Sequence, residues 1–331
     1  MTEHEQQTED ADPGSAFTDI HYHFVPDEVR RLVEERAEND PDSRYFQVML
    51  DAFPDLVTPS AERELTAISG RAVISLPTAV GPGVSGLGDS ADLVRICNDE
   101  MIAAVAAEAA YASTMITLPW DDPRGAVAEI ERVGGDSAVS GVILHVGLQQ
   151  TRLVDDATLE PVYRALSGRG LALFLHPVQE APPRGMEQWF LSNVLASPMA
   201  TSLAAARLML SGMLDRVPNL TLIIPHLGGT LPYLAQRIAD QSGTGDAAHD
   251  VPHYLRTRAY LDTCSFHPPA LDCALDTVGA DGLLLGSDFP FRGPVIRAVD
   301  DVESDLGLDG AERVLNGNLA RLQGASHAVL W

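Results

Sequence analysis

The sequence contains no lysine. All 22 basic residues of its 331 are arginines. Without lysine the chain cannot form a Schiff base with a carbonyl substrate or pyridoxal phosphate, and it has no P-loop lysine for phosphate. It also lacks the carboxylated lysine that bridges two metal ions in many barrel hydrolases. A metal site in this chain is therefore expected to hold a single ion.

Cysteines and long apolar runs are also scarce. The three cysteines, Cys97, Cys264 and Cys273, lack metal-type spacing, and their odd number argues against a disulfide framework. No apolar run reaches the roughly 18 residues of a membrane span. Residues 1–17 are acidic and hold no apolar signal-peptide core. We therefore expect a cytoplasmic protein, with residues 1–17 as a disordered acidic tail.

The acidic composition and the missing motifs exclude further classes. The formal net charge of −25 would repel nucleic acid and anionic membranes. The segment GPGVSG, residues 81–86, has the glycine order of a dinucleotide fingerprint, but Pro82 interrupts it and the next helix is expected only near Ser90. The G-x-S-x-G motif of serine hydrolases is absent. We expect no organic cofactor and no serine nucleophile.

Short apolar segments alternate with amphipathic helices along the chain. Strands are expected over residues 18–23, 71–78, 112–119, 140–147, 171–177, 220–226, 259–266 and 282–288. Eight strands alternating with helices predict a (β/α)₈ TIM barrel, with a doubly wound open sheet as the alternative. Residues 18–331 are expected to form one domain, in which residues 24–60 make a small helical lid after the first strand.

Ionisable side chains gather at the ends of these expected strands. His21 and His23 end the first strand and share one face, because alternate strand residues point the same way. His176 ends the fifth strand, His226 the sixth and Asp288 the eighth. The carboxyl ends of barrel strands open onto one face, where active sites lie. Histidines with one carboxylate suit a mononuclear divalent ion, zinc first and manganese second.

These segments resemble the amidohydrolase superfamily, and within it the branch of α-amino-β-carboxymuconate-ε-semialdehyde decarboxylase and related non-oxidative decarboxylases. The matching motifs are DIHYHFVP, LFLHP, IIPHLGGTLPYLAQRI and LLLGSDFPF, and the resemblance covers residues 17–323. It implies a catalytic histidine beside the metal at His226. It implies that the metal ligands are His21, His23, His176 and Asp288.

The resemblance also suggests substrate-binding residues. Arg237 falls where the decarboxylase places an arginine that reaches the substrate in a neighbouring subunit; a helix ion pair with Asp240 is the alternative. Trp189 matches a tryptophan near the pocket, or else is a core aromatic. The lid is shorter than in the decarboxylase, and the second substrate arginine of that family does not align with a residue here. Arg44 is the candidate for that position. Without that arginine, a monocarboxylate substrate is favoured over a dicarboxylate. His267, just after the seventh strand, faces the active-site side and is a further substrate candidate.

Together these patterns predict a metal-dependent decarboxylase, a carbon–carbon lyase that removes carbon dioxide from an unsaturated or aromatic carboxylic acid. His226 and Asp288 would manage the proton, since histidine titrates near neutrality. The same residues would serve a hydrolase of a lactone or amide, and a non-catalytic metal-binding barrel is a third possibility. The lysine-free, single-metal pattern favours the lyase. One divalent ion, a small carboxylic acid and a possible homodimer complete the expectation.

Overall fold

The computed structural model describes most of the chain, in residues 17–37, 48–57, 60–77, 91–150, 152–178, 182–265 and 267–325. Arg44, the acidic segment 1–16 and the glycine-rich segment 81–86 lie outside the described residues.

Eight parallel strands pair in chain order in one sheet. They are β1 Phe17–His23, β2 Gly70–Ser75, β3 Tyr111–Ile116, β4 Val139–Val146, β5 Ala172–Pro177, β6 Leu222–Ile224, β7 Ala259–Asp262 and β8 Leu283–Leu284. The segment after β8 returns to β1: Ile20 N–H donates to Leu285 O at 2.9 Å, and the N–H of Asp288 donates to His21 O at 2.8 Å. These bonds close the sheet, so the predicted (β/α)₈ barrel is confirmed and the open sheet is not formed.

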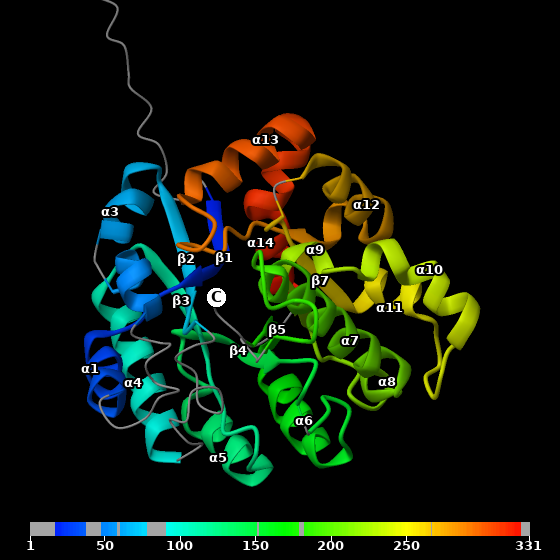
Figure 1. Cartoon of the computed structure of the whole chain (residues 1–331), viewed down its shortest axis with the longest axis horizontal. Coiled ribbons are helices and arrows are strands. Elements are labelled where there is room, and N and C mark those ends of the chain that lie inside the picture. Colours follow the sequence, from blue (N-terminus) through cyan, green and yellow to red (C-terminus); the bar gives the residue numbers. More distant parts are fainter. Residues whose placement is uncertain are drawn as a thin grey trace, which may run out of the picture.

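Helices surround the strands, and successive β/α units follow one another around the ring in Figure 1. The principal ones are α1 Asp27–Ala37, α3 Ser60–Ala67, α4 Ala91–Ala107, α5 Pro123–Val133, α6 Glu160–Arg169, α7 Ser197–Leu210, α10 Leu231–Ser242, α11 Val251–Arg258, α12 Pro268–Val278, α13 Val295–Glu312 and α14 Asn318–Ala325. Shorter turns are η1 Pro54–Leu56, η2 Ala157–Leu159, η3 Ser192–Ala196, α8 Met213–Arg216, α9 Pro225–Gly228, η4 Ala280–Gly282 and η5 Arg313–Gly317. Within the described ranges, no helix has both the length and the apolar character needed to span a bilayer.

The core has two layers, because each strand is covered on both faces. A small cluster fills the barrel interior, with members that include Ile20, Val73, Met115, Ile143, Phe174, Ile223 and Leu284. A larger one joins the outer strand faces to the helices. Parallel strands buried in this way are expected to be almost wholly apolar. The buried polar side chains at the carboxyl ends of the strands are therefore exceptions that need partners.

Several strands end earlier than the sequence predicts. Pro225 begins α9 directly after β6, so His226 lies in a turn with a left-handed backbone, φ 57°. Asp288 lies four residues beyond β8 and is also left-handed, φ 57°. Gly286 allows this path: a Cβ there would come within 2.7 Å of the Asp262 Cβ and 3.0 Å of the His21 Cβ. Tertiary packing, rather than strand pairing, thus places these two side chains.

The described parts of the expected lid are α1, residues 48–52 and η1. Residues 48–52 are helical, and Met49 is buried. The segment is tied to the end of β1, because Val25 N–H donates to Leu56 O at 2.8 Å. Met49 and Phe53 both line the pocket at the barrel mouth.

Candidate metal centre and active site

Four side chains predicted as metal ligands converge at the carboxyl end of the barrel. One ligand atom from each of His21, His23, His176 and Asp288 lies within 4.8 Å of the others, and all four residues are buried. His176 Nε2 is 3.1 Å from His21 Nε2. Asp288 Oδ1 is 3.3 Å from the Nε2 atoms of both His21 and His23. Three imidazoles and one carboxylate oxygen therefore surround a common point.

The protein holds the second nitrogen of each of these rings. The contacts are His21 Nδ1 with Asp262 Oδ2 at 2.7 Å, His23 Nδ1 with Ser75 Oγ at 3.2 Å, and His176 Nδ1 with Pro177 O at 3.0 Å. A carbonyl oxygen only accepts, so His176 must carry its proton on Nδ1 and direct its Nε2 lone pair inward. Partners of this kind fix the tautomer and orientation of metal-ligating histidines.

The charges at this point fit a divalent cation. Burial lowers the pKa of His176 well below its usual value, with neighbouring histidines adding to the effect. Burial also opposes charge on His21, but Asp288 and Asp262 outweigh it and raise the His21 pKa to about 10. His23 Nε2 is buried and has no hydrogen-bond partner among the described residues. The raised His21 pKa shows that this point favours positive charge, which a bound cation would supply in place of the ring proton. Three imidazole nitrogens and a buried carboxylate are the donor set that a zinc-like ion takes.

His226 lies beside this group and contacts its carboxylate from the other side. Its Nε2 is 3.5 Å from Asp288 Oδ2, whereas Asp288 Oδ1 faces His21 and His23. The His226 side chain is 20% exposed, so it reaches the open pocket. Asp288 thus joins the ligand group to a histidine that can exchange protons with a bound molecule.

Asp262, the last residue of β7, is a functional residue that the sequence analysis missed. Its Oδ2 holds His21, while its Oδ1 accepts the backbone N–H of His226 at 2.7 Å and of Cys264 at 3.0 Å. It is fully buried. One carboxylate thereby fixes both a metal-ligand ring and the turn that carries His226. The sequence predicts a strand over residues 259–266, which places Asp262 in its interior. A carboxylate inside a largely apolar strand was the signal that could have identified it.

Asp19 is a second buried carboxylate at this end of the barrel. It accepts hydrogen bonds from the backbone N–H of His21 at 2.9 Å and of Ser287 at 3.1 Å, and from the Ser287 hydroxyl. Burial raises the Asp19 pKa to about 6, against the lowering effect of these hydrogen bonds. It joins β1 to the segment that leads to Asp288.

Cys264 forms a second close group with His21 and His226, whose ligand atoms also lie within 4.8 Å of one another. Burial raises the pKa of the Cys264 thiol well above its usual value. This group offers three donor atoms, whereas His21, His23, His176 and Asp288 offer four, the number that zinc takes in a closed site. The group of three histidines with Asp288 is the better metal site.

A pocket of about 950 Å³ opens above the metal centre. Its apolar wall includes Met49, Phe53 and Phe291, and the rings of Phe53 and Phe291 are 4.8 Å apart. Its floor includes His176, His226 and Asp288. The volume and the mixture of apolar walls with a few polar groups are typical of a small-molecule site.

Of the residues predicted to bind substrate, Arg44 lies outside the described residues, and the other three do not line this pocket. Trp189 is 80% exposed, in a left-handed conformation with φ 56°, and its neighbour Phe190 lines the pocket instead. Arg237 is exposed on α10, and His267 is exposed at the start of α12. Asp240 accepts a hydrogen bond from Gln236 at 2.8 Å, and no ion pair joins it to Arg237. Action of Arg237 in a neighbouring subunit stays a prediction.

His145 on β4 is buried and does not belong to the ligand group. Its ring centroid is 6.1 Å from that of His176, and its Nε2 has no hydrogen-bond partner in the described structure. Burial lowers its pKa to about 3, so the ring is neutral.

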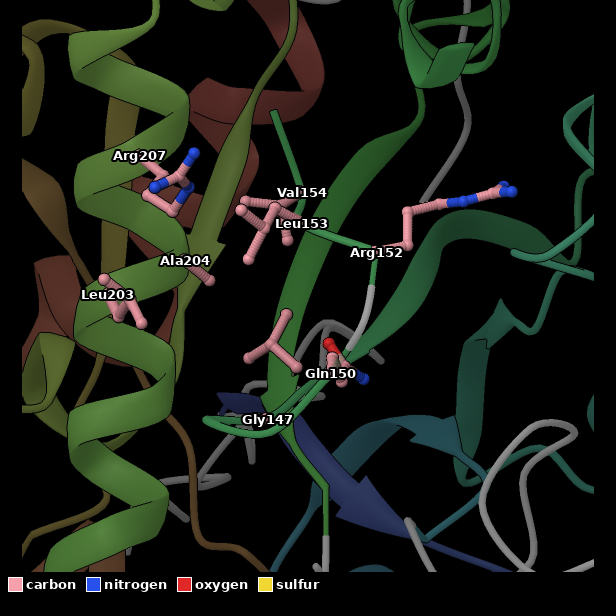
Figure 2. A pocket seen from close by; sticks show the side chains of 9 residues that line it. Gly147, Gln150, Arg152, Leu153, Val154, Leu203, Ala204 and Arg207 are labelled. Atoms are coloured by element: carbon pink, nitrogen blue, oxygen red, sulfur yellow. The ribbon is translucent and has the colours of Figure 1, made fainter. Parts of the chain in front are cut away.

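A second hollow lies between α7 and the segment that follows β4 (Figure 2). Leu203, Ala204 and Arg207 on α7 face Leu153 and Val154 across it. Its volume is about 10 Å³, about the space of a single water. Arg207 is already paired through Nε with Asp155 Oδ1 at 2.6 Å. This hollow is too small for a substrate.

The chain matches known proteins over nearly its whole length. Residues 18–322 match the model of the amidohydrolase family. The 6-methylsalicylic acid decarboxylase of Penicillium expansum is 28% identical over 281 residues, which cover 82% of this chain and 84% of the relative. The 2-amino-3-carboxymuconate-6-semialdehyde decarboxylase of Dictyostelium discoideum is 24% identical over 247 residues, 71% of this chain and 67% of the relative.

A solved structure shares the fold. The dihydroxybenzoic acid decarboxylase from Polaromonas sp. JS666, with bound manganese and the inhibitor 2-nitroresorcinol, superposes with a TM-score of 0.77. It is 23% identical and covers 92% of this chain and 96% of its own. The family match, which spans residues 18–322, shows that the chain belongs to the amidohydrolase family.

Proposed function

We propose that this protein is a metal-dependent non-oxidative decarboxylase that releases carbon dioxide from an unsaturated or aromatic carboxylic acid. The observation that carries the proposal is the placement of Asp288, with one oxygen toward three histidine nitrogens and the other 3.5 Å from His226 Nε2. Relatives of this chain that decarboxylate 6-methylsalicylic acid and an amino-carboxymuconate semialdehyde support the same chemistry.

One divalent ion would be held by His21, His23, His176 and Asp288. Zinc suits three histidines and a carboxylate, and manganese, present in a structural neighbour, is the alternative. When bound, the ion supplies Lewis acidity that draws electron density from a coordinated substrate oxygen.

The residues of the chain orient the acid and move the proton. The apolar wall of Met49, Phe53 and Phe291 would hold the unsaturated part of the substrate above the floor. His226 and Asp288 would deliver a proton to the carbon that bears the carboxylate. That carbon–hydrogen bond forms, the carbon–carbon bond to the carboxylate breaks, and its electron pair restores the conjugation. The departing group becomes carbon dioxide, which is neutral and therefore compatible with the apolar wall.

Hydrolysis of a lactone or amide remains the alternative on the same residues. The two reactions differ in product rather than in the site they need. The lyase is proposed because two relatives that cover most of the chain are decarboxylases, and because the chain has no lysine for a second metal ion.

The proposal extends to a homodimer and a cytoplasmic location. Exposed apolar side chains cluster along η3 and α7, a pattern typical of protein interfaces; they are Phe190, Val194, Leu195, Met199 and Leu203. A dimer would give Arg237, which is exposed on α10, a way to act in a partner's pocket. Cys97, Cys264 and Cys273 carry free thiols, which suits a reducing compartment.

A product assay tests the function. The purified protein, stripped of metal and reloaded with zinc or manganese, is incubated with salicylate-like and muconic acids, and evolved carbon dioxide is measured. The same preparations are incubated with aromatic lactones and amides. We expect metal-dependent carbon dioxide release from at least one acid. Hydrolysis of a lactone or amide without any decarboxylation would overturn the proposal in favour of the alternative.

A further inference from the structure

Arg292 lies at the mouth of the pocket, four residues after Asp288. The backbone N–H groups of Phe291 and Arg292 both donate to Asp288 O, at 2.8 and 3.3 Å. Phe289 in the same turn is buried and stacks on Tyr22, with ring centroids 4.6 Å apart. The base of the Arg292 side chain is therefore fixed relative to the metal centre.

Arg292 is the single arginine among the described residues that line the pocket. Because the chain has no lysine, no other permanently charged cation of the described chain lines it. Arg292 thus lines the pocket even though its side chain is exposed.

Arg292 and the reacting groups differ in exposure. His176 and Asp288 at the floor are 6% and 8% exposed, whereas Arg292 belongs to the exposed class. The carbon that receives the proton must lie near His226 and Asp288. A side chain at the exposed mouth is suited to contact another part of the bound acid.

The chemistry also argues against pairing of Arg292 with the carboxylate that leaves. A guanidinium binds a carboxylate strongly through two parallel hydrogen bonds. The leaving carboxylate becomes neutral carbon dioxide, so such a pair would stabilise the substrate more than the transition state and slow the reaction. A second carboxylate keeps its charge throughout, and holding it costs the reaction nothing.

Besides Asp288 at the floor, Glu187 is the acidic side chain among the described residues that line the pocket. Its Oε2 accepts the backbone N–H of Gly185 at 2.8 Å, which holds it to its own turn.

We propose that Arg292 binds a second carboxylate of the substrate, remote from the one that leaves, and so selects dicarboxylic acids. The inference rests on the proposed decarboxylase function for the position of the leaving carboxylate. It reverses the monocarboxylate preference expected from the sequence, where no lid arginine could be matched.

Binding of unreactive acids tests this selection without turnover. Isothermal titration of the manganese-loaded protein gives the Kd of benzene-1,3-dicarboxylate and of benzoate for wild type, Arg292→Met and Arg292→Lys. Arg297→Met on α13 is the matched control, because it removes the same charge outside the pocket lining. Melting curves confirm that each variant is folded.

We expect wild type to bind the dicarboxylate more tightly than benzoate. Arg292→Met should weaken dicarboxylate binding roughly 10- to 100-fold and benzoate binding less than about 3-fold, with Arg292→Lys between and the control unchanged. Equal losses for both acids, no loss for either, or a wild type without preference for the dicarboxylate would each overturn the proposal. If the protein prefers the dicarboxylate through Arg292 but releases no carbon dioxide from any acid, the proposed decarboxylase function is contradicted and the role of Arg292 in binding is not.

Discussion

The floor and the mouth of the pocket are built in different ways. At the floor, each histidine of the ligand group is buried and its second ring nitrogen is held by another group of the protein. At the mouth, Phe190 is 82% exposed and Arg292 is exposed as well. The floor is fixed before any substrate arrives, whereas the mouth keeps side chains that can adjust to one.

This difference suggests that the floor carries out the reaction and that the mouth determines which acid binds. A pre-organised floor supplies interactions that cost no reorganisation when the reaction occurs. An exposed mouth contributes less per contact, because water competes for its charged groups. Substitutions at the floor should therefore abolish turnover, and those at the mouth should change which acid binds.

The largest effect is expected for Asp288→Asn. The amide removes the negative charge and leaves one acceptor oxygen where the carboxylate has two, so it cannot serve both the metal and His226. Turnover should therefore fall at least about 10³-fold and bound metal should be lost. Decarboxylation rate and metal content by mass spectrometry are the measurements. The exposed Asp281→Asn, which breaks only an ion pair with Arg321, is the control. Full metal content with normal turnover in Asp288→Asn would remove this residue from the site.

His226→Ala should lose turnover but keep its metal. Its proposed role is proton transfer beside the ligand group, an effect worth roughly 10²- to 10⁴-fold in rate. The ratio of metal to protein should stay at the wild-type value. A variant that loses metal together with activity would show that this histidine belongs to the ligand group and that the assignment is wrong.

Asp262→Asn tests whether the support of the floor matters as much as the ligands. The variant weakens the grip on His21 Nδ1 and on the backbone N–H of His226. Loss of such a partner typically costs 10- to 100-fold in metal affinity or activity, so we expect a drop of about that size, measured by competition with a chelator. Asp272→Asn on the exposed side of α12 is the matched control. If the metal affinity is unchanged in this variant, Asp262 does not support the metal centre.

The smallest effect is expected from the apolar wall. Phe53→Ala removes a ring that packs on Phe291 at 4.8 Å. An aromatic pair contributes about 0.5–1.5 kcal/mol, so KM should rise roughly 2- to 10-fold with kcat nearly unchanged. Steady-state kinetics of Phe53→Ala and of the exposed control Val48→Ala measure it. A fall in kcat as large as that of His226→Ala would erase the distinction between floor and mouth.

The sequence predicts the barrel and the ligand group because both follow from local rules. Alternating apolar segments mark the strands, and the strand-end positions of His21, His23 and His176 bring them to one face. Asp262 escaped notice because its partners, His21 and His226, become neighbours only when the strands close into a barrel.

The mouth was less predictable for a related reason. Trp189 follows a loop whose left-handed backbone turns the ring outward, and no residue spacing encodes that turn. Arg292 enters the pocket through the hydrogen bonds of its turn to Asp288 O, which are likewise contacts within a loop. The residues proposed to select the substrate lie in loops, and the path of a loop depends on tertiary packing that the residue pattern of the sequence does not encode.

The closure of β1 onto the segment after β8 has a consequence for synthesis of the protein. Two of the three rings in the ligand group come from the first strand, and its carboxylate follows the last. A nascent chain therefore cannot assemble the site until nearly all of it has left the ribosome. Metal binding would then be a late step, in which the ion cross-links the first strand to the segment after the last strand.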